Sequence, residues 1–107
     1  MGYFDKRAIK ELLSQKGLVV GEINLDHDEY IAEVFIEVSA TGLYSPCDIG
    51  LIAGKIENLE TQLVMQGFIH DIKMGDLYKG NWKILIHFLD DDEIEKWEEE
   101  AIGKKKF

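Results

Sequence analysis

SPCDIGLIAGKIENLETQLVMQG, residues 45–67, is the stretch that decides the fold of this chain of 107 residues. It predicts one long amphipathic helix, because Ser45 stands at the N-cap, Pro46 follows at the first helical position and Asp48 completes a capping box. Gly67 predicts the end of the helix, since glycine readily takes the left-handed conformation. The apolar residues recur at helical spacing and predict one buried stripe: Ile49, Ile52, Ala53, Ile56, Leu59 and Leu63.

The residues before this helix predict a shorter helix followed by a hairpin. Asp5 is the N-cap of the first helix, and Gly17 ends it. Residues 18–25 and 30–38 alternate between apolar and polar side chains, which predicts two strands joined by a polar turn. Pairing these strands from the turn places Glu22 opposite Glu33. Two like charges in that position repel each other. Either both side chains extend apart into water, which is the simpler expectation, or Lys83, a cation, or an arginine or lysine of a partner compensates them.

The residues after Gly67 repeat this pattern. Residues 68–74 and 81–89 predict two more strands, with a turn at 75–80 that sets Asp71 against Lys83. The order helix, strand, strand thus occurs twice, with a period of about 50 residues. Residues 91–102 predict a final, acidic helix.

The predicted fold class is α+β, with one domain over residues 1–107. Hairpin-joined strands favour antiparallel pairing, so we expect a four-stranded antiparallel sheet built from two hairpins. The two main helices would pack on one face of this sheet, in the order α-β-β-α-β-β, followed by the acidic C-terminal helix.

Composition and charge exclude several classes of function. The formal net charge is −9, which argues against direct nucleic-acid binding, because that binding depends on lysine and arginine. No apolar run reaches the ~20 residues of a membrane helix, so no membrane association is expected. Cys47 is the single cysteine, which favours a cytoplasmic location without disulfides. No phosphate-binding loop, metal-ligand motif or catalytic constellation is evident, so we expect no cofactor, no metal and no enzyme.

The face of the sheet turned away from the helices is the most informative predicted surface. It mixes apolar and charged side chains, and a solvated face is normally polar. Such a mixture is typical of an interface, unless the C-terminal helix covers it with Trp97 or a homodimer forms through it. Its predicted residues are Leu18, Val20, Glu22, Ile31, Glu33, Phe35, Glu37, Ile69, Asp71, Lys73, Lys83, Leu85, His87 and Leu89.

The leading hypothesis is a non-catalytic protein-binding module of the inhibitor or immunity type, with a basic protein as its partner. An acidic surface attracts a basic partner and makes the encounter dependent on salt. The acidic segment at residues 90–100 would extend this surface. The predicted contacts are Glu22, Glu33, Phe35, Glu37, Leu85, Asp90, Asp91, Asp92, Glu95, Glu98 and Glu99.

Two alternatives come from other functional classes. The first is a small-molecule-binding protein or small enzyme, with a pocket between the sheet and the Gly50/Gly54 flank of the long helix. His70 or Cys47 would be the polar group of that pocket, and His70 is expected on the opposite sheet face from His87. The second alternative is a self-associating structural subunit.

Overall fold

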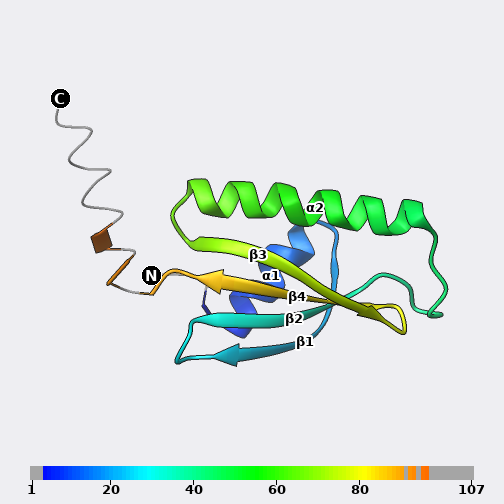
Figure 1. Ribbon diagram of the computed structural model, residues 1–107, viewed down its shortest axis with the longest axis horizontal. Helices are drawn as coiled ribbons and strands as arrows, with labels where there is room; N and C mark the ends of the chain where they lie inside the picture. Colours follow the sequence, from blue (N-terminus) through cyan, green and yellow to red (C-terminus); the bar gives the residue numbers. More distant parts are fainter. Residues whose placement is uncertain (1–3, 91, 94, 97–107) are drawn as a thin grey trace.

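Two helices and four strands make up the computed structural model, which describes residues 4–90, 92–93 and 95–96 (Figure 1). The strands form one antiparallel sheet in the order β1-β2-β4-β3. The predicted α+β class is therefore confirmed, and most of the predicted acidic helix at 91–102 lies outside the described residues. The elements are α1 (Lys6–Gln15), β1 (Val19–Asp26), β2 (Ile31–Glu37), α2 (Pro46–Met65), β3 (Ile69–Tyr78) and β4 (Asn81–Phe88).

Both helices begin at the caps that the sequence predicts. The Asp5 carboxylate accepts a hydrogen bond from the Ala8 N–H at 3.1 Å. At the start of α2, the Ser45 hydroxyl accepts from the Asp48 N–H at 3.3 Å, and the Asp48 carboxylate accepts from the Ser45 N–H at 2.9 Å. This reciprocal pair satisfies two backbone donors that a helix start otherwise leaves free. Within the described part of the chain, no helix combines the length and apolar character needed to cross a bilayer.

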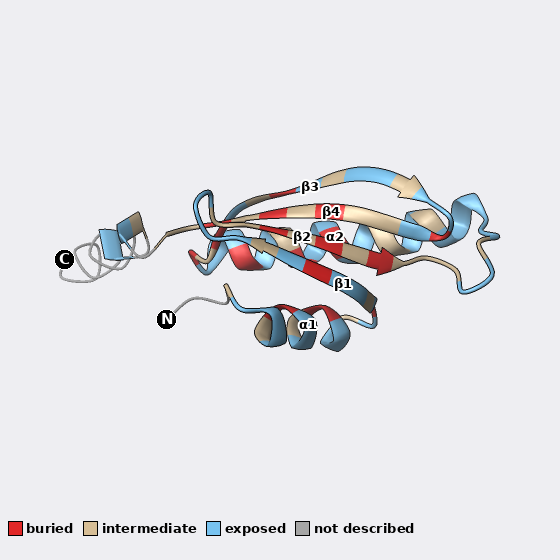
Figure 2. Cartoon of the chain, turned by 90° about the horizontal axis from the view of Figure 1, so that it is seen from below, coloured by how far each residue is buried: buried red, intermediate tan, exposed pale blue. Residues whose placement is uncertain are grey.

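The hydrophobic core lies between the two helices and one face of the sheet. Figure 2 shows the buried residues of α1 turned toward β1. Leu18 and Ile69, which the sequence places on the uncovered face, are buried in this core, and Val20 packs against it. The helices contribute Ile9, Leu13, Ile56, Leu59 and Leu63, and the two central strands contribute Ala32, Val34, Ile36, Ile84, Ile86 and Phe88.

The first hairpin has a different register from the predicted one. Glu33 pairs with Asn24, not with Glu22, so the predicted pair of like charges is wrong. The difference arises at the turn, which occupies residues 27–30 instead of the predicted 26–29, because Asp26 still belongs to β1 and pairs with Ile31. Further from the turn, a β-bulge between Val20 and Ile23 adds a residue to β1, so that Val20 pairs with Ile36.

The second hairpin closes with a shorter turn than the predicted one at 75–80. β3 continues to Tyr78, and the turn consists of Lys79 and Gly80, whose φ angles are +50° and +80°. Positive φ at both central residues is typical of the two-residue turn that matches the twist of a hairpin. Asp71 consequently pairs with His87 and not with Lys83.

The two halves of the chain repeat the same backbone hydrogen bonds at positions 50 apart. At the end of α1, the Leu18 N–H donates to the Leu13 carbonyl at 3.1 Å. At the end of α2, the Phe68 N–H donates to the Leu63 carbonyl at 3.0 Å. A glycine with positive φ completes each helix end: Gly17 (+78°) and Gly67 (+76°).

The bonds that join the two hairpins follow the same repeat. The Val38 N–H donates to the Gly80 carbonyl at 2.7 Å. Its equivalent 50 positions away is the bond from the Phe88 N–H to the Tyr30 carbonyl, at 2.8 Å. These paired bonds indicate that each hairpin end is anchored by the other half of the chain.

An approximate twofold axis follows from the pairing of β2 with β4. Val34 pairs directly with Ile84, and these two residues are themselves 50 positions apart. A residue that pairs with its own equivalent lies on the axis that relates the two. The fold therefore consists of two helix–strand–strand units, which meet where β2 pairs with β4.

Alanine at Gly50 or Gly54 is expected to stabilise the protein. A Cβ atom at either position would meet nothing within 4 Å, so no neighbouring backbone requires glycine there. Glycine in a helix interior costs about 0.5–1 kcal/mol relative to alanine. Thermal unfolding of Gly50→Ala and Gly54→Ala measures the gain, and a loss of stability would contradict the open surroundings of both positions.

Candidate docking face

The face of the sheet opposite the helices, here called the helix-free face, has its centre on β2 and β4. Phe35 pairs with Lys83, and Glu33 pairs with Leu85. These four side chains and Glu37 are neither fully buried nor fully exposed. The centre of the face thus carries two large apolar side chains among charged ones, as the sequence predicts for these positions.

β-Bulges shape both edges of the helix-free face. In β1 the bulge includes Gly21 and Glu22, and in β3 the second register shift includes Gly75 and Asp76. Each bulge is therefore a glycine followed by an acid. A Cβ atom on Gly75 would lie 3.2 Å from the Lys83 carbonyl oxygen, so the close approach of β3 to β4 favours glycine there. Bulges of this kind redirect a side chain at a sheet edge.

A hollow of about 550 Å³ lies on the helix-free face between the two bulges. The acid of each bulge lines it, which brings Glu22 of β1 and Asp76 of β3 to the same cavity. β2 contributes a third carboxylate, Glu33, and an aromatic ring, Phe35. The complete lining is Glu22, Glu33, Phe35, Asp76, Tyr78, Lys79, Asn81 and Lys83.

The charges around the hollow are not paired with one another. Among the described residues, no carboxylate of the hollow lies within 4.0 Å of a lysine nitrogen. Glu33 instead accepts a hydrogen bond from the Asn24 side chain at 3.2 Å, and the Lys79 nitrogen lies 5.3 Å from the centre of the Tyr78 ring. The three acids and two lysines leave one net negative charge at the hollow.

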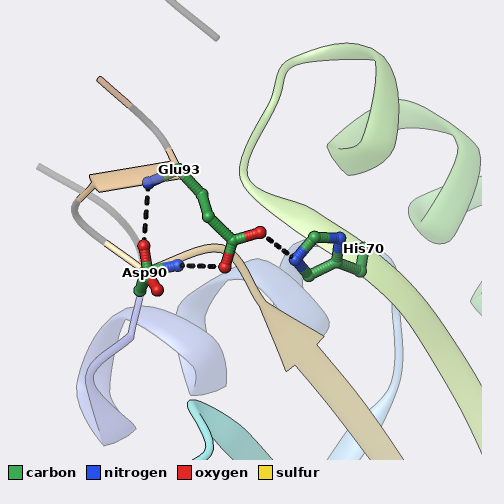
Figure 3. A network of polar contacts seen from close by, with 3 residues as sticks. All are labelled: His70, Asp90 and Glu93. Carbon is green, nitrogen blue, oxygen red and sulfur yellow. Dashed lines mark hydrogen bonds and ion pairs between the residues drawn. The ribbon is translucent and has the colours of Figure 1, made fainter. Parts of the chain in front are cut away.

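A polar network lies where β4 ends (Figure 3). Glu93 and Asp90 form a reciprocal pair: the Glu93 N–H donates to the Asp90 carboxylate at 2.8 Å, and the Asp90 N–H donates to the Glu93 carboxylate at 3.4 Å. The other Glu93 oxygen lies 2.6 Å from the His70 Nε2. The centres of the His70 and His87 rings are 4.8 Å apart, so the prediction that these two side chains lie on opposite faces of the sheet is wrong. In the described residues, no three potential ligands gather to hold a metal ion.

The predicted contact residues fall into three groups. Glu22, Glu33 and Phe35 line the hollow, whereas Glu37 and Leu85 lie on the same face outside its lining. Asp90 belongs to the polar network, and the exposed Asp92 and Glu95 follow it. Three predicted contacts lie outside the described residues: Asp91, Glu98 and Glu99.

Sequence reasoning missed the contribution of β3 to the hollow. Asp76 and Tyr78 were expected in a turn, but β3 continues through both. The signal for the longer strand was the dipeptide Lys79-Gly80, because a glycine at the second turn position favours a two-residue hairpin.

The alternative pocket was expected between the sheet and the Gly50/Gly54 flank of α2. Gly54 lines a hollow of about 550 Å³ whose lining comes from α2 alone and includes neither His70 nor Cys47. Cys47 is exposed. His70 is also exposed and is engaged with Glu93. The hollow on the helix-free face lies elsewhere.

Comparisons with known proteins add no further information about this site. None of the protein-family models matches the chain, and no similar protein was found among curated proteins or solved structures. A functional proposal for this chain therefore has to rest on its own surface.

Proposed function

We propose that this protein is a non-catalytic cytoplasmic binding module of the inhibitor or immunity type, which docks a basic protein on its helix-free face. The observation that carries the proposal is the hollow lined by three carboxylates and Phe35. It lies on the same sheet face as Leu85, and the chain has a net charge of −9. Apolar side chains at the centre of an interface supply its affinity, whereas surrounding charges set its orientation and speed of encounter.

The acidic segment beyond β4 supports the same proposal. Asp90 and Glu93 form a capping box, which favours the start of the predicted acidic helix. Further acids in residues 90–100 would strengthen the attraction toward a basic partner over about one Debye length.

Charge reversal on β2 tests the proposal. The variant Glu33→Lys/Glu37→Lys is expected to reduce capture of basic proteins from a lysate at least about tenfold, because it replaces attraction with repulsion on the docking face. Immobilised protein is compared with the variant at about 50 and about 300 mM salt, and mass spectrometry identifies the bound proteins. We expect the wild-type protein to retain basic proteins that the higher salt releases.

The matched control is Glu11→Lys/Glu57→Lys, which makes the same change in net charge on exposed residues of α1 and α2. If both variants lost capture of basic proteins equally, the loss would follow from net charge alone, and the proposal of a specific docking face would be contradicted. Light scattering of the purified protein supplies a second check. A dimer that Glu33→Lys/Glu37→Lys dissociates would mean that a second copy of the chain, rather than a basic partner, occupies the face.

A further inference from the structure

We propose that the hollow on the helix-free face receives a single arginine side chain from the docked partner. This inference rests on the proposed function, because it names the residue that anchors the basic protein. It goes beyond general charge attraction, since it assigns a chemical group to one cavity.

The first argument is the convergence of carboxylates from three strands. Glu22, Glu33 and Asp76 come from β1, β2 and β3, and Glu22 and Asp76 lie within the bulges of the two edge strands. Carboxylates accept strong, charge-assisted hydrogen bonds, and the planar guanidinium group offers five donors in a fixed fork. Three acceptors spread around one cavity suit that fork better than the compact ammonium of lysine.

The second argument is the aromatic part of the lining. Phe35 and Tyr78 lie on different strands and both line the hollow. A guanidinium stacks on aromatic faces and is more weakly hydrated than an ammonium, so it loses less on entering such a site. The Lys79 nitrogen lies 5.3 Å from the centre of the Tyr78 ring, within the range of a cation–π contact.

The third argument is the charge balance of the hollow. Three carboxylates and the two lysines, Lys79 and Lys83, sum to one negative charge. One guanidinium would neutralise that charge, whereas the two lysines would repel a cluster of cations. The hollow therefore fits one arginine flanked by uncharged residues, and the lysines act against a polybasic stretch.

The test uses a short peptide as its probe, acetyl-Gly-Ala-Arg-Ala-Gly-amide, titrated into the protein of 107 residues and followed by NMR. The Trp82 indole N–H is a built-in reporter, because it donates to the Gly75 carbonyl at 2.9 Å, within the β3 bulge. We expect saturable shifts at this indole and at the Asp76 amide. The matched peptide with citrulline, which keeps the shape but lacks the charge, should bind at least about tenfold more weakly. A lysine peptide should bind several-fold more weakly than the arginine peptide.

The variant Glu22→Gln/Asp76→Asn keeps the size of both bulge side chains and removes their charge. It should weaken binding of the arginine peptide at least about tenfold. The control variant Asp28→Asn/Glu29→Gln, in the exposed β1–β2 turn, should leave the affinity for this peptide unchanged. Dispersed NMR spectra of both variants verify that they fold. Equal binding of the arginine and citrulline peptides, or shifts confined to other surfaces, would overturn the proposal, as would no shift at about 10 mM peptide.

The two proposals fail in different ways. If Glu33→Lys/Glu37→Lys abolishes capture of basic proteins while Glu22→Gln/Asp76→Asn leaves it intact, the docking face stands and the arginine site is wrong. If the arginine peptide binds the hollow but no basic protein depends on β2, the site stands as a ligand site and the proposed function is wrong.

Discussion

The Gly80→Ala variant is expected to lose about 2–4 kcal/mol of unfolding free energy. Gly80 has a φ of +80° in the two-residue turn between β3 and β4, where an L-residue is strained. The new Cβ atom would also lie 2.4 Å from the Ser39 carbonyl oxygen, which is backbone and cannot rotate away. The same turn anchors the other half of the chain, since the Gly80 carbonyl accepts from the Val38 and Ser39 N–H groups.

Gly42→Ala is the matched control for this variant. Gly42 has the same φ of +80°, but a Cβ atom there would meet nothing within 4 Å. It should therefore lose only the conformational contribution, about 1 kcal/mol. Urea unfolding of both variants separates the two contributions. Equal losses would show that the contact with Ser39 relaxes at little cost.

Truncation of Leu63 to alanine should destabilise the protein by about 2–5 kcal/mol, the usual range for a buried leucine. Leu63 is 2% exposed, and Leu13, its equivalent in the first half of the chain, is 0% exposed. Both pack in one core, so Leu13→Ala should cause a loss in the same range. For a small domain such a loss is a large share of the total stability.

Leu51→Ala is the control for these core variants. Leu51 lies on the same helix as Leu63 but is 67% exposed, so its truncation should change stability by less than about 0.5 kcal/mol. Denaturant midpoints at constant slope provide the measurement. A large loss for Leu13→Ala together with a small loss for Leu63→Ala would contradict the shared core of the two halves.

Local signals in the sequence predict the helices well. Ser45, Pro46 and Asp48 place the start of α2 because capping depends on residues within one turn of each other. Gly17 and Gly67 end the helical stretches for the same reason, since a positive φ favours glycine wherever the chain is. The four strands were also predicted, although β3 extends further than expected.

The candidate face was predicted only in part. Glu33, Phe35, Glu37 and Leu85 lie on the helix-free face as expected, because β2 and β4 pair without interruption and the alternation of side chains holds. The predicted alternation was wrong at Leu18 and Ile69, which belong to the core, and at Val20, which packs against it. These residues lie near the bulges of the edge strands β1 and β3. An extra residue in a strand reverses the sheet face on which the residues beyond it lie.

The sequence by itself determined the caps, the two helices, the repeated helix–strand–strand order and the α+β class, since each depends on residues close together in the chain. Only the tertiary structure decided that Val34 pairs with Ile84 and that Glu22 and Asp76 line one hollow. The physical reason is that bulge positions and strand order depend on how two distant hairpins fit the same core. Local periodicity carries no information about which edges meet.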